Sequence, residues 1–487
     1  MAETQISRRA LLAGITASSS SLLAAAKPIG PPEFWTLTEA AAALRRRAIS
    51  SEELTRLCLN RIHRIDPALN AFITLTEESA LAQARACDQR LAKRPGDVSP
   101  LFGIPIALKD NIDTAHLRTT AASKVFFDRI PDTDAEVTAR LKAAGTVLLG
   151  KLNLDEMAFE GVGTTSCFGP VHNPWNLDRI TGGSSAGSAA ALAAGLCYGS
   201  VGSDDGGSVR IPAAYCGITG FKTSYGRVST RGVIPSAYSL DTIGPITRSA
   251  ADAALMLQVL AGFDPLDAIT AAAPVPDYLA GMNETLSGLR LGIARDYFFE
   301  ALDPEVSAAT ETAIQLLRSR FRSVRDVTLP RFRFVPNGSY DVELLHFQQP
   351  FLEKSPELYH PWSLRQLKGL QSTTTLAYVE TLKRLRDCRR DIRRVFEDVD
   401  VIVMPTKRDL APTIRETVDE TYQRAASNTS AFNRFGTPAI SIPCGFSRSG
   451  LPIGLQITGP AFGEGRVLAV AHAWQQLTDW HRRHSSL

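Results

Sequence analysis

The 487-residue sequence lacks the features that mark several classes of protein. No segment contains the roughly 20 apolar residues that a membrane-spanning helix needs, so no stable membrane span is expected. The seven cysteines include no Cys-x-x-Cys pair and the eight histidines no His-Glu-x-x-His spacing, so neither a disulfide framework nor a metal site is predicted. A net charge of +3 indicates no preference for acidic partners.

Basic residues are densest between Lys383 and Arg394, where acidic and apolar residues interrupt them. Such interleaving is typical of the solvated face of a helix, and a nucleic-acid patch is the less favoured alternative. We therefore expect no nucleic-acid partner.

The first 28 residues differ in pattern from the rest. A polar start ends in Ser7-Arg8-Arg9, and a mildly apolar stretch then runs to Ala26. This layout predicts a twin-arginine signal peptide and export to the periplasm. The alternative is a flexible or amphipathic arm, in which case the protein would be cytoplasmic.

The length allows up to three domains or a single α/β unit, and 44% hydrophobic and 21% charged residues are typical of a globular protein with an ample core. Helical patterns alternate with short apolar runs, which indicates a layered α/β fold around a largely buried sheet. Residues 331–371 are aromatic and proline-rich, and no elements are predicted there. The expected helices are 50–62, 77–91, 133–145, 250–260, 303–321, 372–396 and 466–477, and the expected strands 101–110, 146–149, 289–294, 324–329, 399–404, 439–442 and 453–458. Capping boxes are predicted at Ser50–Glu53 and Thr133–Glu136, and the last two strands are expected to pair.

Two glycine- and serine-rich clusters, Thr181–Ser188 and Gly202–Arg210, flank an alanine-rich helix. Glycine permits tight turns and close approach of a ligand to the backbone, and Ser184 or Ser185 suits the helix N-cap. Two readings stay open from this pattern: a serine-based active site, or ordinary surface turns. Gly183–Gly187 also fits the Gly-x-Ser-x-Gly elbow, but the apolar strand that this elbow requires does not precede it.

A nucleophilic serine needs a base, and neither cluster contains a histidine. Lysine can serve where burial disfavours its charged form. Lys109, at the end of an apolar strand, is the best-placed candidate, although a lysine at a strand end is ordinarily a surface residue.

Several further segments occur in a fixed order with the two clusters. Together they resemble the amidase signature family over Trp35 to Arg482. The segments are Gly103–Ile112, Gly150–Glu156, Phe168–Trp175, Gly182–Ala190, Asp204–Pro212, Phe221–Val228, Asp241–Arg248, Val401–Thr406 and Gly436–Pro443.

The resemblance implies that 29–487 form a single domain with an α/β/α fold, whose mixed central sheet is covered by helices on both faces. It implies a catalytic core at about 100–260 and a specificity region at about 330–430. The implied activity is hydrolysis of a small-molecule or peptide carboxamide without metal or organic cofactor. A homodimer is left open.

The resemblance also implies a Ser-cisSer-Lys triad. Ser208 would be the nucleophile, Ser184, preceded by a cis peptide bond, the proton relay, and Lys109 the general base. The backbone N–H groups of Asp205, Gly206, Gly207 and Ser208 would form the oxyanion hole. We further expect Asp204 and Arg210 to brace this loop as a charge-assisted pair.

Asp205 departs from the family pattern, which has a small or apolar residue there. Its charge would either weaken oxyanion stabilisation or select a cationic substrate. Two alternatives to a free-standing amidase remain: a glutamine-hydrolysing amidotransferase subunit, and a catalytically inactive binding protein on the same fold.

Overall fold

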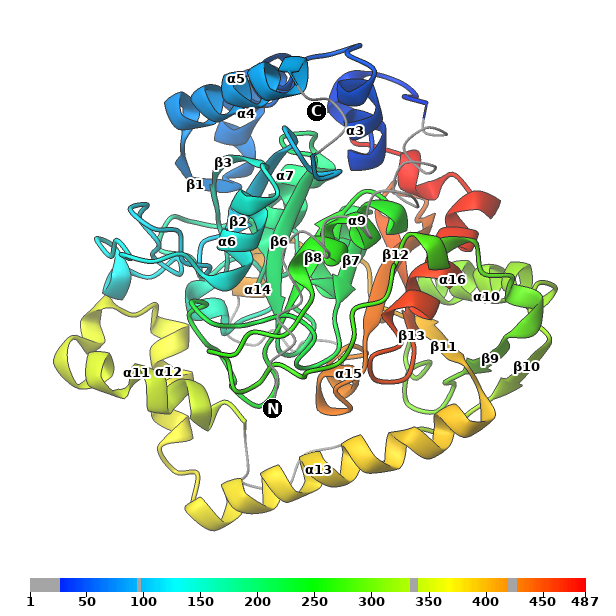
Figure 1. Cartoon of the computed structure of the whole chain (residues 1–487). Coiled ribbons are helices and arrows are strands. Elements are labelled where there is room, and N and C mark those ends of the chain that lie inside the picture. Colours follow the sequence, from blue (N-terminus) through cyan, green and yellow to red (C-terminus); the bar gives the residue numbers. More distant parts are fainter. Residues whose placement is uncertain (1–26, 94–97, 333–339, 419–426) are drawn as a thin grey trace, which may run out of the picture.

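The structure is a computed structural model that describes residues 27–93, 98–332, 340–418 and 427–487. Its centre is a mixed 11-stranded sheet (Figure 1). Across the sheet the strands lie in the order β1 (Phe72–Leu75), β3 (Val147–Leu152), β2 (Pro105–Lys109), β6 (Gly199–Asp204), β8 (Thr242–Thr247), β7 (Thr219–Lys222), β12 (Ala439–Phe446), β13 (Pro452–Thr458), β11 (Val401–Pro405), β9 (Arg290–Ile293) and β10 (Ser323–Asp326). A separate hairpin joins β4 (His172–Asn173) and β5 (Asn176–Ile180).

Strand directions within the sheet are mixed. The trio β3, β2 and β6 is parallel, as is the trio β11, β9 and β10. The pairs in between, from β6 through β8, β7, β12 and β13 to β11, are antiparallel, and so is β1 with β3. Because β2 and β6 run in the same direction, their carboxyl ends meet at one edge of the sheet.

Helices cover both faces of this sheet, as the resemblance implies (Figure 1). Successive residues of a strand point to opposite faces. In β6, a side chain at Gly199 would meet Met256 of α9, whereas the Ser200 hydroxyl bonds the carbonyl of Ser188 in α7. The α-helices of the described chain are α3 (Leu37–Arg45), α4 (Ser51–Leu69), α5 (Glu77–Lys93), α6 (Glu136–Ala143), α7 (Ala186–Ala193), α8 (Arg210–Cys216), α9 (Ala250–Leu260), α10 (Pro304–Arg318), α11 (Val342–Lys354), α12 (Pro361–Leu370), α13 (Thr375–Asp398), α14 (Ile414–Val418), α15 (Ser430–Arg434) and α16 (Glu464–Leu477).

Most predicted elements are present within a few residues of their expected bounds. Ser50 and Glu53 form the expected capping box of α4, and β12 pairs with β13 as expected. The capping box predicted at 133–136 is wrong, because α6 begins after Ala135 without a side-chain cap. Ser185 is the N-cap position of α7, but it too makes no capping hydrogen bond.

The stretch 331–371, for which no elements were predicted, contains α11 and α12. Pro361 begins α12, where a missing N–H costs nothing, whereas Pro350 lies inside α11. Leucines of both helices pack against Phe126 and Met157 in one hydrophobic cluster.

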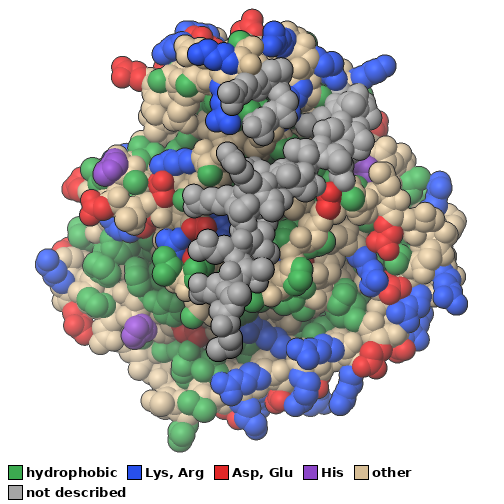
Figure 2. Space-filling view, in the orientation of Figure 1, with side chains coloured by type: hydrophobic (Ala, Val, Ile, Leu, Met, Phe, Trp, Pro, Cys, Tyr) green, Lys and Arg blue, Asp and Glu red, His purple; other side chains and the backbone are tan. Residues whose placement is uncertain are grey.

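The basic run of α13 lies along one edge of the molecule, where Lys and Arg side chains gather (Figures 1 and 2). Arg384 pairs with Glu380, and Arg390 with Asp387 and Asp391 of the same helix. These exposed, paired charges confirm the prediction of a solvated helical face.

The predicted leader falls outside the described residues except for its last two positions. Among the helices that are described, none combines the length and the apolar character required to cross a membrane.

Candidate active site

Lys109 is the last residue of β2, which lies next to β6 in the sheet. At this end of β2 its side chain contacts Ser184 of the first serine cluster. The Lys109 side chain is completely buried. Its Nζ donates to Ser184 Oγ at 2.7 Å and to Ser203 Oγ at 2.9 Å. Two residues 75 positions apart, both predicted from the sequence as site residues, are thus in direct contact.

The environment of Lys109 favours its neutral form. Burial lowers the pKa of Lys109 to about 8, although the nearby Asp205 opposes this shift. A lysine in this state can accept a proton near neutral pH, which an exposed lysine cannot do efficiently.

A buried carboxylate fixes the loop that carries Ser184. Asp155 accepts hydrogen bonds from the backbone N–H groups of Val162 and Gly163. A Cβ on Gly183 would lie 2.1 Å from Asp155 Oδ2, so only glycine fits there. The peptide bond between Gly183 and Ser184 is cis, as the resemblance implies.

Ser208 lies in the loop between β6 and α8 and is 6% exposed. Its Oγ donates to Asp205 Oδ1 at 3.4 Å, a long hydrogen bond. The two serine loops are joined through the backbone, since Ser185 N donates to the Ser208 carbonyl at 3.1 Å. In the described chain the Ser208 hydroxyl makes no hydrogen bond to Ser184, so the expected second link of the relay is not formed in this conformation.

The predicted oxyanion-hole amides differ in their availability. Gly207 N donates to Asp204 Oδ1 at 2.9 Å and is therefore already occupied, contrary to expectation. The N–H of Asp205 interacts with the carboxylate of its own side chain, whereas the N–H groups of Gly206 and Ser208 have no hydrogen-bond partner within the described residues. Gly207 itself must be glycine, because its φ is 137° and a Cβ would lie 2.1 Å from Thr429 Oγ1.

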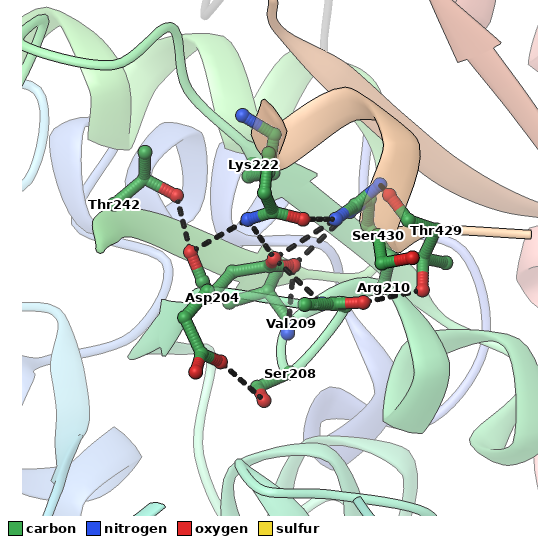
Figure 3. A network of polar contacts seen from close by, with 12 residues as sticks. Asp204, Ser208, Val209, Arg210, Lys222, Thr242, Thr429 and Ser430 are labelled. Atoms are coloured by element: carbon green, nitrogen blue, oxygen red, sulfur yellow. Dashed lines mark hydrogen bonds and ion pairs between the residues drawn. The ribbon is translucent and has the colours of Figure 1, made fainter. Parts of the chain in front are cut away.

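Asp204 and Arg210 form the buried pair that the sequence suggested (Figure 3). Arg210 donates from Nε and Nη2 to the two carboxylate oxygens at 3.0 and 2.9 Å. Burial alone would raise the pKa of Asp204, but the charge and hydrogen bonds of Arg210 outweigh it and lower this pKa to about 2. Two amides of the loop, Gly207 N and Val209 N, bond the same carboxylate, so the ion pair fixes the loop's shape.

Several residues of the site were missed from the sequence. Arg210 also bonds the Thr429 carbonyl, Asn433 Oδ1 and Gln456 Oε1, all distant in sequence. Ser203, beside Lys109, directly precedes the Asp204 motif and could have been found there. The other missed residues are Asn111, Ser236 and Asp241, which reach the site through Ser203 or Asp205.

The described residues contain no cluster of metal-binding side chains. In the part of the chain that the structure describes, no group of three or more His, Cys, Asp or Glu side chains could hold a metal ion. The chemistry available is that of a buried lysine, three serine hydroxyls and two free backbone amides.

Comparison with known proteins agrees with this picture. Residues 53–468 match the family described as Amidase. The A subunit of the glutamyl-tRNA(Gln) amidotransferase of Methylococcus capsulatus is 44% identical, over 92% of this chain and 98% of that protein.

Solved structures are also similar. The corresponding A subunit of the glutamyl-tRNA(Gln) amidotransferase from Thermotoga maritima superposes with a TM-score of 0.76 at 33% identity, covering 92% of this chain and 96% of that one. A 6-aminohexanoate cyclic dimer hydrolase superposes with a TM-score of 0.84 at 29% identity, covering 93% and 99% of the two chains. The chain therefore belongs to the amidase signature family and is a hydrolase of carbon–nitrogen bonds.

Proposed function

We propose that this protein cleaves a carboxamide through an acyl-enzyme on Ser208. The supporting observation is the 2.7 Å hydrogen bond between the buried Lys109 and Ser184, beside a loop with two unpaired amides. This arrangement suits acyl transfer, which needs a base, a nucleophile and donors for an oxyanion.

In the proposed mechanism, neutral Lys109 takes the proton of Ser184 while Ser184 takes that of Ser208. Ser208 Oγ bonds to the amide carbon, and the carbonyl oxygen becomes an oxyanion that faces the amides of Gly206 and Ser208. The tetrahedral intermediate collapses as the carbon–nitrogen bond breaks, and Ser184 passes a proton to the leaving nitrogen. Water then attacks the ester carbonyl and releases the carboxylic acid.

The Ser208 side chain must rotate before the reaction can begin. Its hydroxyl bonds Asp205 in the structure, so it must turn toward Ser184 before it can lose its proton. Such loose geometry is common in proteins without substrate and tightens when substrate binds.

Labelling with a fluorophosphonate tests the nucleophile. We expect covalent modification of Ser208, no labelling in Ser208→Ala, and a loss of amidase activity of about a thousandfold or more in Ser208→Ala and Ser184→Ala. Ser188→Ala is the matched control, because Ser188 lies on α7 with a buried hydroxyl that has no partner within the described chain. Normal activity of Ser208→Ala would refute the assignment.

The amidotransferase relatives favour one specific setting. Since the 44% identity extends over 98% of such a relative, we rank an amidotransferase subunit that hydrolyses glutamine ahead of a free-standing exported amidase. Glutaminase activity together with co-purification of partner subunits from the cytoplasm would support the first. Activity of the isolated chain on other amides, with cleavage of residues 1–28 during export, would support the second.

A further inference from the structure

Two carboxyl groups lie opposite each other where β6 and β8 end. The antiparallel register pairs Asp204 with Thr242, so the next position places Asp205 opposite Asp241. Like charges directly across a ladder destabilise a sheet. Such a pair therefore needs a proton or a cation between its members.

The protein supplies hydrogen bonds to this pair but no ion pair. Ser236 Oγ donates to Asp205 at 2.8 Å, and Ser236 N donates to Asp241 at 2.9 Å. Within the described residues, no Lys, Arg or His side chain forms a salt bridge with either carboxyl. Lys109 is the nearby cation, but its Nζ bonds Ser184 and Ser203 instead.

The pKa values of both carboxyl groups are raised, because they are removed from water and no ion pair in the described chain compensates their charge. Burial raises the pKa of Asp205 against the opposing hydrogen bond from Ser236, and burial followed by the charge of Asp205 raises the pKa of Asp241. Ionised carboxylates in such surroundings gain strongly from a cation.

The pair lies beside the nucleophile and beside open space. Asp205 is partly exposed, and its Oδ1 is 3.4 Å from Ser208 Oγ. A Cβ added at Gly206, the next residue, would meet no atom within 4 Å. Near Lys109, the buried Asn111 bonds Ser203 through its amide nitrogen, and its Oδ1 has no hydrogen-bond partner in the described chain.

We infer that Asp205, backed by Asp241, binds an ammonium group of the substrate, so that the enzyme prefers carboxamides carrying an amine a short carbon chain away from the scissile carbonyl. The inference rests on the proposed acyl-enzyme at Ser208. A cation at normal hydrogen-bond distance from Asp205 Oδ1 lies within about 6 Å of Ser208 Oγ. The attacked carbon lies about 3 Å from the same oxygen, so the ammonium and the attacked carbon are at most about 9 Å apart, a separation that a short carbon chain spans.

Binding of the ammonium would also release the Ser208 hydroxyl from Asp205. An N–H⁺ donor at Asp205 Oδ1 competes with the Ser208 hydroxyl for the same acceptor, which frees that hydroxyl to turn toward Ser184. The substrate cation likewise offsets a negative charge that would otherwise border the developing oxyanion. Asp205 is thus a specificity-determining residue of this site.

Two pairs of amides of closely similar shape test the inference on the full-length protein. Alaninamide and isobutyramide differ by an ammonium in place of a methyl group on the first carbon, and 4-aminobutanamide and pentanamide differ in the same way at the third. We expect kcat/KM to favour the cationic member of at least one pair by about ten- to a hundredfold, as a charge-assisted hydrogen bond allows. Equal rates within both pairs would overturn the inference.

Variants assign the preference to Asp205. The isosteric Asp205→Asn should bring the cationic-to-neutral ratio close to one, and Asp241→Asn should lower it less. Asp128→Asn is the control, because Asp128 is an exposed acid and should leave the ratio unchanged. A preference that persists in a folded Asp205→Asn variant, as judged by its melting temperature, would overturn the assignment.

Labelling distinguishes failure of the inference from failure of the proposed function. If none of the four amides turns over, protection of Ser208 from a fluorophosphonate by alaninamide or 4-aminobutanamide, but by neither neutral partner, still supports the cation site, and equal protection overturns it. An unreactive Ser208 overturns the proposed function and, with it, this inference.

Discussion

Replacing Lys109 by alanine is the sharpest test of the proposed base. Burial lowers the pKa of Lys109 from 10.5 to about 8. At pH 7 roughly one molecule in ten then carries a neutral lysine, compared with roughly one in three thousand for an exposed side chain. The shift corresponds to about 3 kcal/mol of differential stabilisation of the neutral form.

The expected pH profile follows from the direction of this shift. Activity should rise with pH through about 8 and level off above it, because the neutral form of Lys109 is the active one. Lys109→Ala should lower kcat/KM by about 10²- to 10⁴-fold, the range for a positioned general base, and should remove the inflection. The assay is kcat/KM for a neutral amide between pH 6 and 10, so that the substrate itself does not titrate.

The chain contains a matched control for this experiment. Lys222 is also completely buried, and burial lowers its pKa to about 7. Within the described residues its Nζ bonds only the carbonyl of Thr223, and it points away from Ser208 (Figure 3). Lys222→Met should keep the inflection near 8. An inflection that persists in Lys109→Ala, or that disappears in Lys222→Met, would refute the assignment of the base.

Two further predictions concern the loop around Ser208. Arg210→Ala leaves the Asp204 carboxylate buried and unpaired, so urea denaturation should show a loss of about 3–5 kcal/mol, whereas removal of the exposed Arg390 should change nothing measurable. Gly207→Ala places a Cβ 2.1 Å from a threonine hydroxyl in a strained backbone region and should cost about 1–3 kcal/mol. Gly206→Ala, which meets open space, should melt like the wild type, and equal melting of the two glycine variants would contradict this reasoning.

The sequence was informative wherever hydrophobic periodicity and local motifs act over short distances. The strand β11 is a continuous apolar run and the pair β12 and β13 is largely apolar, because both faces of these strands are buried. Helices α11 and α12 were missed because prolines and aromatic residues obscure their periodicity, and their packing partners near Phe126 lie over 200 residues away.

The same distinction applies to the site. Lys109, Ser184 and Ser208 belong to recognisable motifs, but the contact of Asp205 with Ser236 and its place opposite Asp241 depend on the register of β6 and β8. Periodicity does not define such a register in advance. The occupied amide of Gly207 likewise follows from the position of Asp204 in three dimensions, which a motif does not specify.

The bonds of Arg210 have a consequence for synthesis of the chain. This side chain joins the nucleophile loop to Thr429 and Asn433 near α15 and to Gln456 in β13. Since a protein emerges from the ribosome from its N-terminus, Ser208 is made some 250 residues before the last of these partners. An incomplete chain therefore carries its nucleophile in a loop that Asp204 holds but that lacks its anchors at Thr429, Asn433 and Gln456. We expect full reactivity only when synthesis is nearly finished.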